Sequence, residues 1–138
     1  MADKRNRGRR ITDRITEAYY ELMKIVAENN HERMFEYYVE DDEAYIFKIV
    51  NSSPAQETAY PLFKQNIDTY MSECPEDSIE CFKKQLDKCL LRPMRTAFQL
   101  SFISEDGKSK PVEMYMVSIP DLDKKVCMVV GVMFDIRD

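Results

Sequence analysis

Hydrophobic and polar positions follow two different periods along this chain, and the change of period separates its first elements. Between residues 11 and 34 apolar side chains recur three and four positions apart, which is the spacing of one face of an amphipathic helix. Residues 35–39 and 43–49 alternate at period two and are rich in aromatic side chains, and the acidic residues 40–42 separate them. The pattern predicts a helix followed by a β-hairpin.

The middle of the chain contains one strong helix signal. Pro75 is followed by Glu76 and Asp77, and this suits a helix start because proline fits the first turn and acids face the positive end of the helix dipole. An apolar stripe then continues to about Leu91. The preceding segment, residues 55–73, is less regular and predicts one or two short helical turns.

The last third predicts three antiparallel strands. Apolar side chains alternate through residues 98–102, an Asp-Gly turn follows, and residues 112–119 and 126–134 form two further apolar runs. The final run is apolar almost throughout, which predicts a strand buried on both faces at the centre of the sheet. The order of elements predicts an α+β fold: a five-stranded antiparallel sheet with helices on one face, preceded by the amphipathic helix.

Three segments of different character follow from this pattern. Residues 1–10 are a basic flexible tail, residues 11–34 are the amphipathic helix, and residues 35–138 are the α+β domain. The apolar seam of the helix has heptad spacing over about three repeats. It consists of Ile11, Ile15, Ala18, Leu22, Ile25 and Asn29. Because a helix this short is marginal alone in water, we expect the seam to pack on a second copy of the chain, which would make a homodimer, on its own domain, or on both.

Composition restricts the class of protein. The chain has 138 residues, of which 44% are hydrophobic and 33% charged, enough for one core with a soluble surface. Its longest apolar runs are far shorter than the about 20 residues of a membrane-spanning helix. No apolar stretch follows the basic residues to form a signal peptide, so we expect a cytoplasmic protein. The net charge of −5 argues against nucleic-acid binding, while the basic tail could contact an anionic membrane.

The residues that usually carry chemistry are sparse. Four cysteines, Cys74, Cys81, Cys89 and Cys127, form no C-x-x-C pair, and His31 is the single histidine. Metal sites built from cysteine and histidine need paired ligands at short spacing, so no metal site is expected. Three glycines are too few for a glycine-rich phosphate loop. We therefore expect free thiols, no catalytic residues and no enzymatic activity in this domain.

Four short segments of the sequence indicate a relationship to a known family. They are FEYYVEDDEAYIF from residue 35, PED from residue 75, FISEDGK from residue 102 and VVGVMFDIRD from residue 129. In this order they resemble the PAS family, most closely the bacterial branch found beside diguanylate cyclase (GGDEF) and sensor-kinase domains. Gly131 and the pair Asp135-Ile136 are similar to the residues that close many PAS domains before their output helix, although Arg137 departs from the usual Thr.

The resemblance implies a sensory, signal-transducing input domain that dimerises. Asp135 and Ile136 would couple it to an output domain beyond residue 138, a diguanylate cyclase or a histidine kinase. Haem in this family is held by a histidine on the long helix, and none lies there. Flavin-binding members carry a reactive cysteine in a sequence context that Cys74 and Cys81 lack. Neither cofactor is expected.

The sequence also leaves open that the domain binds a small apolar ligand. The residues that would line its pocket are Phe47, Phe63, Phe82, Phe98, Phe102, Met114 and Met116. The same side chains would also fill a closed core, which would leave a purely structural dimerisation module. A different class, the cone-shaped α+β carriers and enzymes of the nuclear-transport-factor type, is an alternative, but a hairpin ahead of the main helix argues against it.

Overall fold

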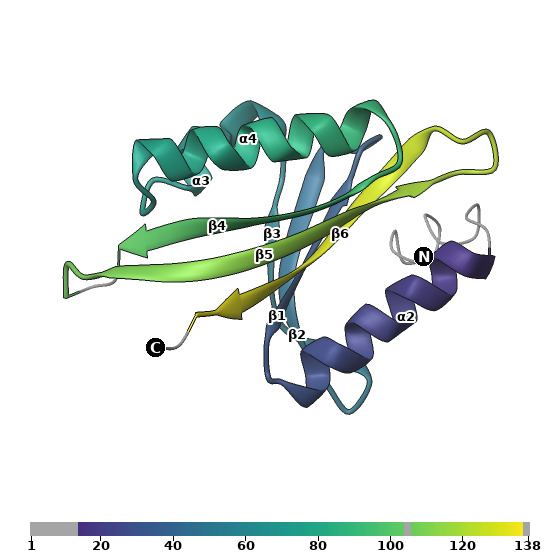
Figure 1. Ribbon diagram of the computed structural model, residues 1–138, viewed down its shortest axis with the longest axis horizontal. Helices are drawn as coiled ribbons and strands as arrows, with labels where there is room; N and C mark the ends of the chain where they lie inside the picture. The colour runs from purple at the N-terminus through teal and green to yellow at the C-terminus, as the bar shows by residue number, and fades with distance from the viewer. Residues whose placement is uncertain (1–13, 104–105, 137–138) are drawn as a thin grey trace.

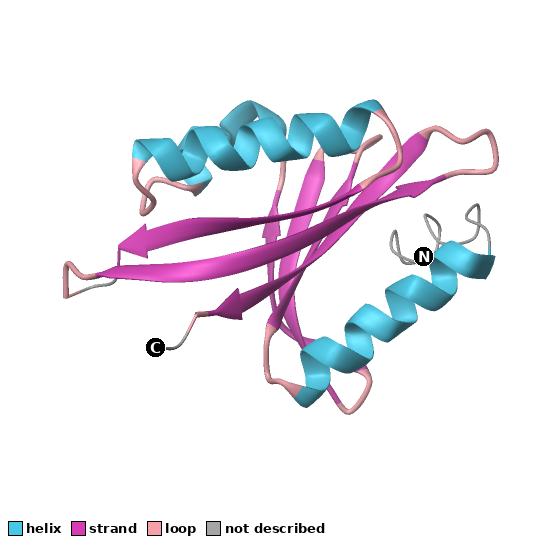
Figure 2. Cartoon of the chain, viewed as in Figure 1, coloured by secondary structure: helices cyan, strands magenta, loops and turns pink. Residues whose placement is uncertain are grey.

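A computed structural model describes residues 14–103 and 106–136. Its centre is a six-stranded antiparallel sheet with the strand order β3-β2-β1-β6-β5-β4 (Figure 1). Helix α4 (Glu76–Leu91) and the short helix α3 (Ile67–Tyr70) lie on one face, and helix α2 (Arg14–Asn29) crosses the other (Figure 2). The α+β class predicted from the sequence is confirmed.

The two central strands come from opposite ends of the domain. β1 (Arg33–Tyr38) pairs with β2 (Glu43–Val50) to form the predicted hairpin, and on its other side it pairs with β6 (Val126–Asp135). Phe35 lies opposite Gly131 in this register. The final strand is therefore central, as its continuous apolar sequence predicts.

The sheet has six strands instead of the expected five. The additional strand is β3 (Ser53–Tyr60), which lies at the edge of the sheet beside β2. Asn51 and Ser52 form a two-residue turn with positive φ angles of 52° and 66°, which suits a tight hairpin. Pro54 is tolerated because an edge strand needs hydrogen bonds on one side alone. The predicted helical turns begin later, at the 3-10 helix η1 (Lys64–Asn66) and α3.

The remaining strands form the predicted meander. β4 (Arg95–Ile103) pairs with β5 (Ser109–Pro120), and β5 pairs with β6. α4 begins with two acidic residues after Pro75, which occupies the N-cap. Ser118 of β5 donates its hydroxyl to the Cys89 carbonyl of this helix and its N–H to the carbonyl of Met94, which lies between α4 and β4.

Alternation along β1 divides the interior into two hydrophobic cores. Phe35 and Tyr37 point toward α3 and α4, whereas Met34 and Tyr38 point toward α2. The second core places α2 against the face opposite to α4, so the helices cover both faces of the sheet. α2 ends at Asn29, five residues before the predicted end at residue 34, since β1 already begins at Arg33. Among the described residues, no helix combines the length and hydrophobicity that crossing a bilayer requires.

Candidate functional site

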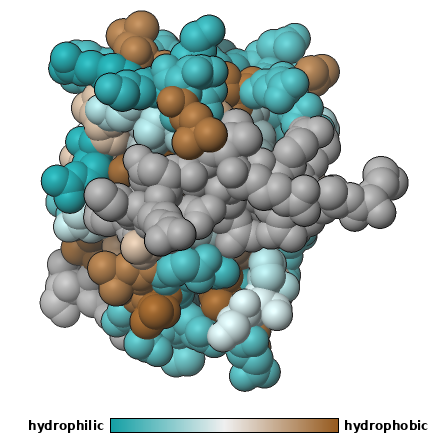
Figure 3. Space-filling model, turned by 90° about the vertical axis from the view of Figure 1, so that its right-hand side faces the viewer, coloured by the Kyte–Doolittle hydropathy of each residue, from teal (hydrophilic) through white to brown (hydrophobic). Residues whose placement is uncertain are grey.

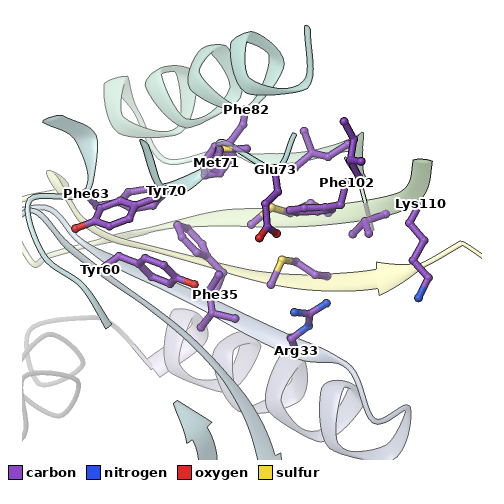
Figure 4. A pocket seen from close by; sticks show the side chains of 16 residues that line it. Arg33, Phe35, Tyr60, Phe63, Tyr70, Met71, Glu73, Phe82, Phe102 and Lys110 are labelled. Carbon is purple, nitrogen blue, oxygen red and sulfur yellow. The ribbon is translucent and has the colours of Figure 1, made fainter. Parts of the chain in front are cut away.

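A cavity of about 310 Å³ lies between the sheet and the α3–α4 layer. This volume is at the lower end of the range of about 300–1,000 Å³ that is typical of small-molecule pockets. Most of its wall is apolar and aromatic, and its side chains come from β1, β2, β3, the α3–α4 segment, β4, β5 and β6 (Figure 4). The aromatic lining residues are Phe35, Tyr60, Phe63, Tyr70, Phe82 and Phe102.

One acidic residue of the β1–β2 turn positions the aromatic end of the cavity. The Phe63 N–H donates to the backbone carbonyl of Asp42 at 2.8 Å, and the Lys64 N–H donates to the Asp42 carboxylate at 2.8 Å. The Tyr37 hydroxyl donates to the same carboxylate at 2.8 Å. Asp42 thereby holds the segment after β3 over the sheet, and Phe63 reaches into the cavity.

The aromatic side chains pack on one another at ring-contact distances. The Phe63 ring centroid lies 5.7 Å from that of Phe35 and 6.0 Å from that of Phe82, and it stacks on Tyr70 at 6.1 Å. Tilted and edge-to-face pairs of this kind add stability beyond the area they bury. Packed aromatic rings therefore form this end of the cavity.

The other end of the cavity is charged. Arg33 on β1, Glu73 before α4 and Lys110 on β5 line it, and all three are exposed to solvent (Figure 4). The Ile103 N–H donates to the Glu73 carbonyl at 2.9 Å and fixes this segment beside β4. Burial raises the pKa of Tyr60, the charge of Arg33 lowers it in part, and Glu73 raises it, so the Tyr60 hydroxyl remains protonated and able to donate.

A polar groove of about 380 Å³ adjoins this charged end. Arg33, Ile46 and Tyr60 line both the cavity and the groove. The groove also contains His31, Glu32, Lys48, Gln56, Thr58 and Asp135. A β-bulge shapes it, since residues 56–57 of β3 lie opposite the single residue Phe47 of β2. The segment between α2 and β1, the start of β1 and the end of β6 meet here.

The structure divides the predicted pocket residues into three groups. Phe63, Phe82, Phe102 and Met114 line the cavity. Phe98 and Met116 belong to the same hydrophobic core but lie outside the cavity wall. Phe47 does not line the cavity, because its position in β2 turns it to the opposite face of the sheet, where it packs in the core under α2. The core between sheet and helices is therefore partly filled and partly hollow.

The predicted seam of α2 faces away from the sheet wherever its side chains are described. Ala18, Leu22, Ile25 and Asn29 are exposed, Leu22 by 56% and Ile25 by 55%. Ile11 and the side chain of Ile15 lie outside the described part of the chain. The helix buries a different stripe against the sheet, formed by Tyr20, Met23 and Ala27. Figure 3 views the molecule from the side on which α2 lies in Figure 1, and it shows hydrophobic side chains on this surface.

Burial disfavours the thiolate form of three of the cysteines. Burial raises the pKa of Cys74 to about 11 and that of Cys127 to about 11, and it also raises the pKa of Cys89, so these thiols are protonated at neutral pH. All four cysteines are free. Within residues 14–103 and 106–136, no three histidine, cysteine or acidic side chains come together as a metal-binding cluster.

The sequence pattern did not predict several of the residues that line the cavity. Tyr60 lies on a strand that the sequence pattern did not predict. Arg33 lies two residues before Phe35 in β1. Because side chains alternate between the two faces of a strand, this spacing would have placed Arg33 on the same face as Phe35, the face of the cavity. Glu73 and Lys110 carry no comparable signal, because their places depend on how the segments flanking β4 cross the sheet.

The fold matches solved structures although no protein-family model and no curated protein matches the sequence. An RNA-binding light-oxygen-voltage receptor aligns with a TM-score of 0.59 at 13% identity, over 78% of this chain and 31% of the receptor chain. A sensory box histidine kinase/response regulator from Burkholderia thailandensis aligns with a TM-score of 0.54 at 10% identity, over 83% of each chain. A domain assigned to a light and redox sensing histidine kinase from Haloarcula marismortui gives 0.52 at 10% identity, over 85% and 99%.

These matches define the class of fold. The chain has the PAS fold, which light-oxygen-voltage and sensory-box domains share, and the resemblance found in the sequence is confirmed at this level. At such low identities the likeness establishes the architecture, and the function has to be argued from the site itself.

Proposed function

We propose that this chain is a non-catalytic sensory input domain that dimerises through α2 and passes the state of its cavity to an output domain following residue 138. A diguanylate cyclase or a histidine kinase would be that output. The domain would act by shifting between two packings of its helices, biased by occupancy of the cavity.

The main support for this proposal is that α2 has apolar side chains on two faces. Its inner stripe is buried on the sheet, while Leu22, Ile25 and Val26 expose apolar side chains on the outside. Exposed apolar side chains at heptad spacing favour a second helix as the partner, and a second copy of the chain offers the same seam. His31, two residues after the end of α2, and Asp135 at the end of β6 line one groove, so a change in the dimer would reach the C-terminal side of the domain.

Further features support a sensory over a catalytic role. The cavity is walled largely by apolar and aromatic side chains, and burial raises the pKa of the Tyr60 phenol among them, a setting for binding instead of turnover. Four free cysteines are typical of a reducing compartment, and we infer that the domain works in the cytoplasm.

The dimer is testable by light scattering coupled to size exclusion. We expect a dimer at high micromolar concentration, and a monomer for the double variant Leu22→Glu/Ile25→Glu, since two carboxylates in an apolar seam oppose association. Leu122→Glu is the matched control: Leu122 is 74% exposed in the turn between β5 and β6, so this variant should remain dimeric.

Circular dichroism of each variant would show that α2 is still folded. A wild-type monomer at high micromolar concentration, or a double variant that stays dimeric, would contradict dimerisation through this helix.

A further inference from the structure

The boundary between the cavity and the polar groove carries two hydrogen-bond donors. Arg33 and Tyr60 line both spaces, and Ile46 is the third residue that they share. In Figure 4 the Tyr60 ring extends along the cavity wall with its hydroxyl toward the end where Arg33 lies. The side chains come from β3 and β1, which lie on either side of β2 in the sheet.

Neither donor is used elsewhere in the described part of the chain. Among residues 14–103 and 106–136, the Arg33 guanidinium makes no ion pair, and neither it nor the Tyr60 hydroxyl makes a hydrogen bond. Tyr60 is half-buried, and its raised pKa keeps the hydroxyl protonated. A guanidinium is a planar fork that matches a carboxylate in two parallel hydrogen bonds.

The charges that line the cavity also favour an anion at this end. Arg33 and Lys110 are cationic and Glu73 is anionic, so the cavity has one excess positive charge. Lys48 adds a cation on the groove side next to Arg33, since the two residues are register partners in β1 and β2. Glu32 and Asp135 lie in the groove but outside the cavity.

We propose that the cavity binds a small amphipathic monocarboxylate, with its apolar or aromatic body against the Phe35–Phe63–Phe82 wall and its carboxylate on Arg33 and Tyr60. This inference rests on the proposed sensory function and names its ligand class. The modest cavity volume of about 310 Å³ limits the body to roughly one ring or a short alkyl chain.

The position of the carboxylate links the ligand to the output side of the domain. Arg33 is the register partner of Met133 in β6, and Asp135 follows two residues later on the same face and lines the groove beside Arg33. A ligand carboxylate neutralises Arg33 and changes the electrostatic field at Asp135. The last residues of β6 therefore sense whether the cavity is occupied.

Isothermal titration calorimetry with 4-phenylbutyrate and octanoate, each compared with its uncharged amide, tests the ligand class. A charge-assisted contact predicts that each acid binds about 10- to 100-fold more tightly than its amide. Arg33→Gln should abolish this preference, and Tyr60→Phe should reduce it. Lys48→Gln is the matched control, because Lys48 lines the groove but not the cavity. This variant should retain most of the preference for the acid.

Backbone amide NMR shifts test the route to the C-terminal side. The acids should shift the Asp135 and Ile136 amides in the wild-type chain, and the amides should shift them less. Equal affinity for acid and amide, or a preference that survives Arg33→Gln, would overturn the carboxylate site while leaving an apolar pocket and the dimer intact. Failure of all four probes to bind at millimolar concentration would overturn the ligand class, whereas the dimer is judged separately by light scattering.

Discussion

Gly131 of β6 has no room for a side chain beside β5. A Cβ atom at this position would be 2.6 Å from the backbone oxygen of Tyr115 and 3.2 Å from side-chain atoms of Met114 and Met116. A backbone oxygen within the sheet cannot rotate away, so any side chain here forces the two strands apart. The close approach gives a physical reason for the glycine in the C-terminal segment that resembles PAS domains.

Gly131→Ala should therefore lower the free energy of unfolding by about 3 kcal/mol, the upper end of the cost of overpacking. Gly107→Ala is the matched control. It has open space around a new Cβ and a φ of +81°, so its cost is the conformational one of about 1 kcal/mol. Urea unfolding of both variants measures the difference. If Gly131→Ala cost no more than Gly107→Ala, β5 and β6 would not approach as closely as described.

At the scale of elements, a buried carboxyl group fixes α2 to the sheet. Glu36 on β1 is fully buried, and it accepts hydrogen bonds from the Tyr20 hydroxyl of α2 and from the Tyr38 hydroxyl at 3.0 Å. A buried acceptor that loses a donor retains its desolvation penalty. The orientation of α2 therefore depends on a polar contact as well as on apolar burial.

Tyr20→Phe should destabilise the fold by about 1–3 kcal/mol, because a buried carboxyl group loses a donor. It should also increase amide hydrogen exchange within α2 more than in α4, since the contact joins α2 to the sheet. Tyr45→Phe is the control: its hydroxyl bonds Glu43 at 2.6 Å in a partly exposed place, and its loss should cost less. Equal exchange of α2 in the two variants would show that the Tyr20–Glu36 contact does not hold the helix.

Periodicity predicted the elements that have one buried face. The hairpin, α4 and the first two strands of the C-terminal meander each carry an alternation or a stripe, whereas β6 was predicted from its continuous apolar run, which is buried on both faces. β3 was missed because most of its side chains are exposed, and it is held by backbone bonds to β2 at the sheet edge. The heptad reading of α2 identified its exposed seam, whereas the stripe that packs on the sheet, Tyr20, Met23 and Ala27, was not distinguished from it.

The whole molecule depends on strands from both chain ends meeting at the centre of one sheet. Glu36 lies opposite Val130, as expected from the hairpin and the apolar final strand. The aromatic wall of the cavity was predicted in part, because Phe63 and Phe82 are large apolar residues near helices. Its charged end was not, since Arg33, Glu73 and Lys110 converge through tertiary packing that no local pattern encodes.

At this scale we propose that the domain is a dimeric receptor for a small molecule held beneath α3 and α4. Native mass spectrometry of the protein purified from cells reports subunit number and retained ligand together. We expect a dimer that carries additional non-protein mass, released on denaturation, and a loss of that mass in Arg33→Gln. A monomer without any retained molecule would contradict the claim.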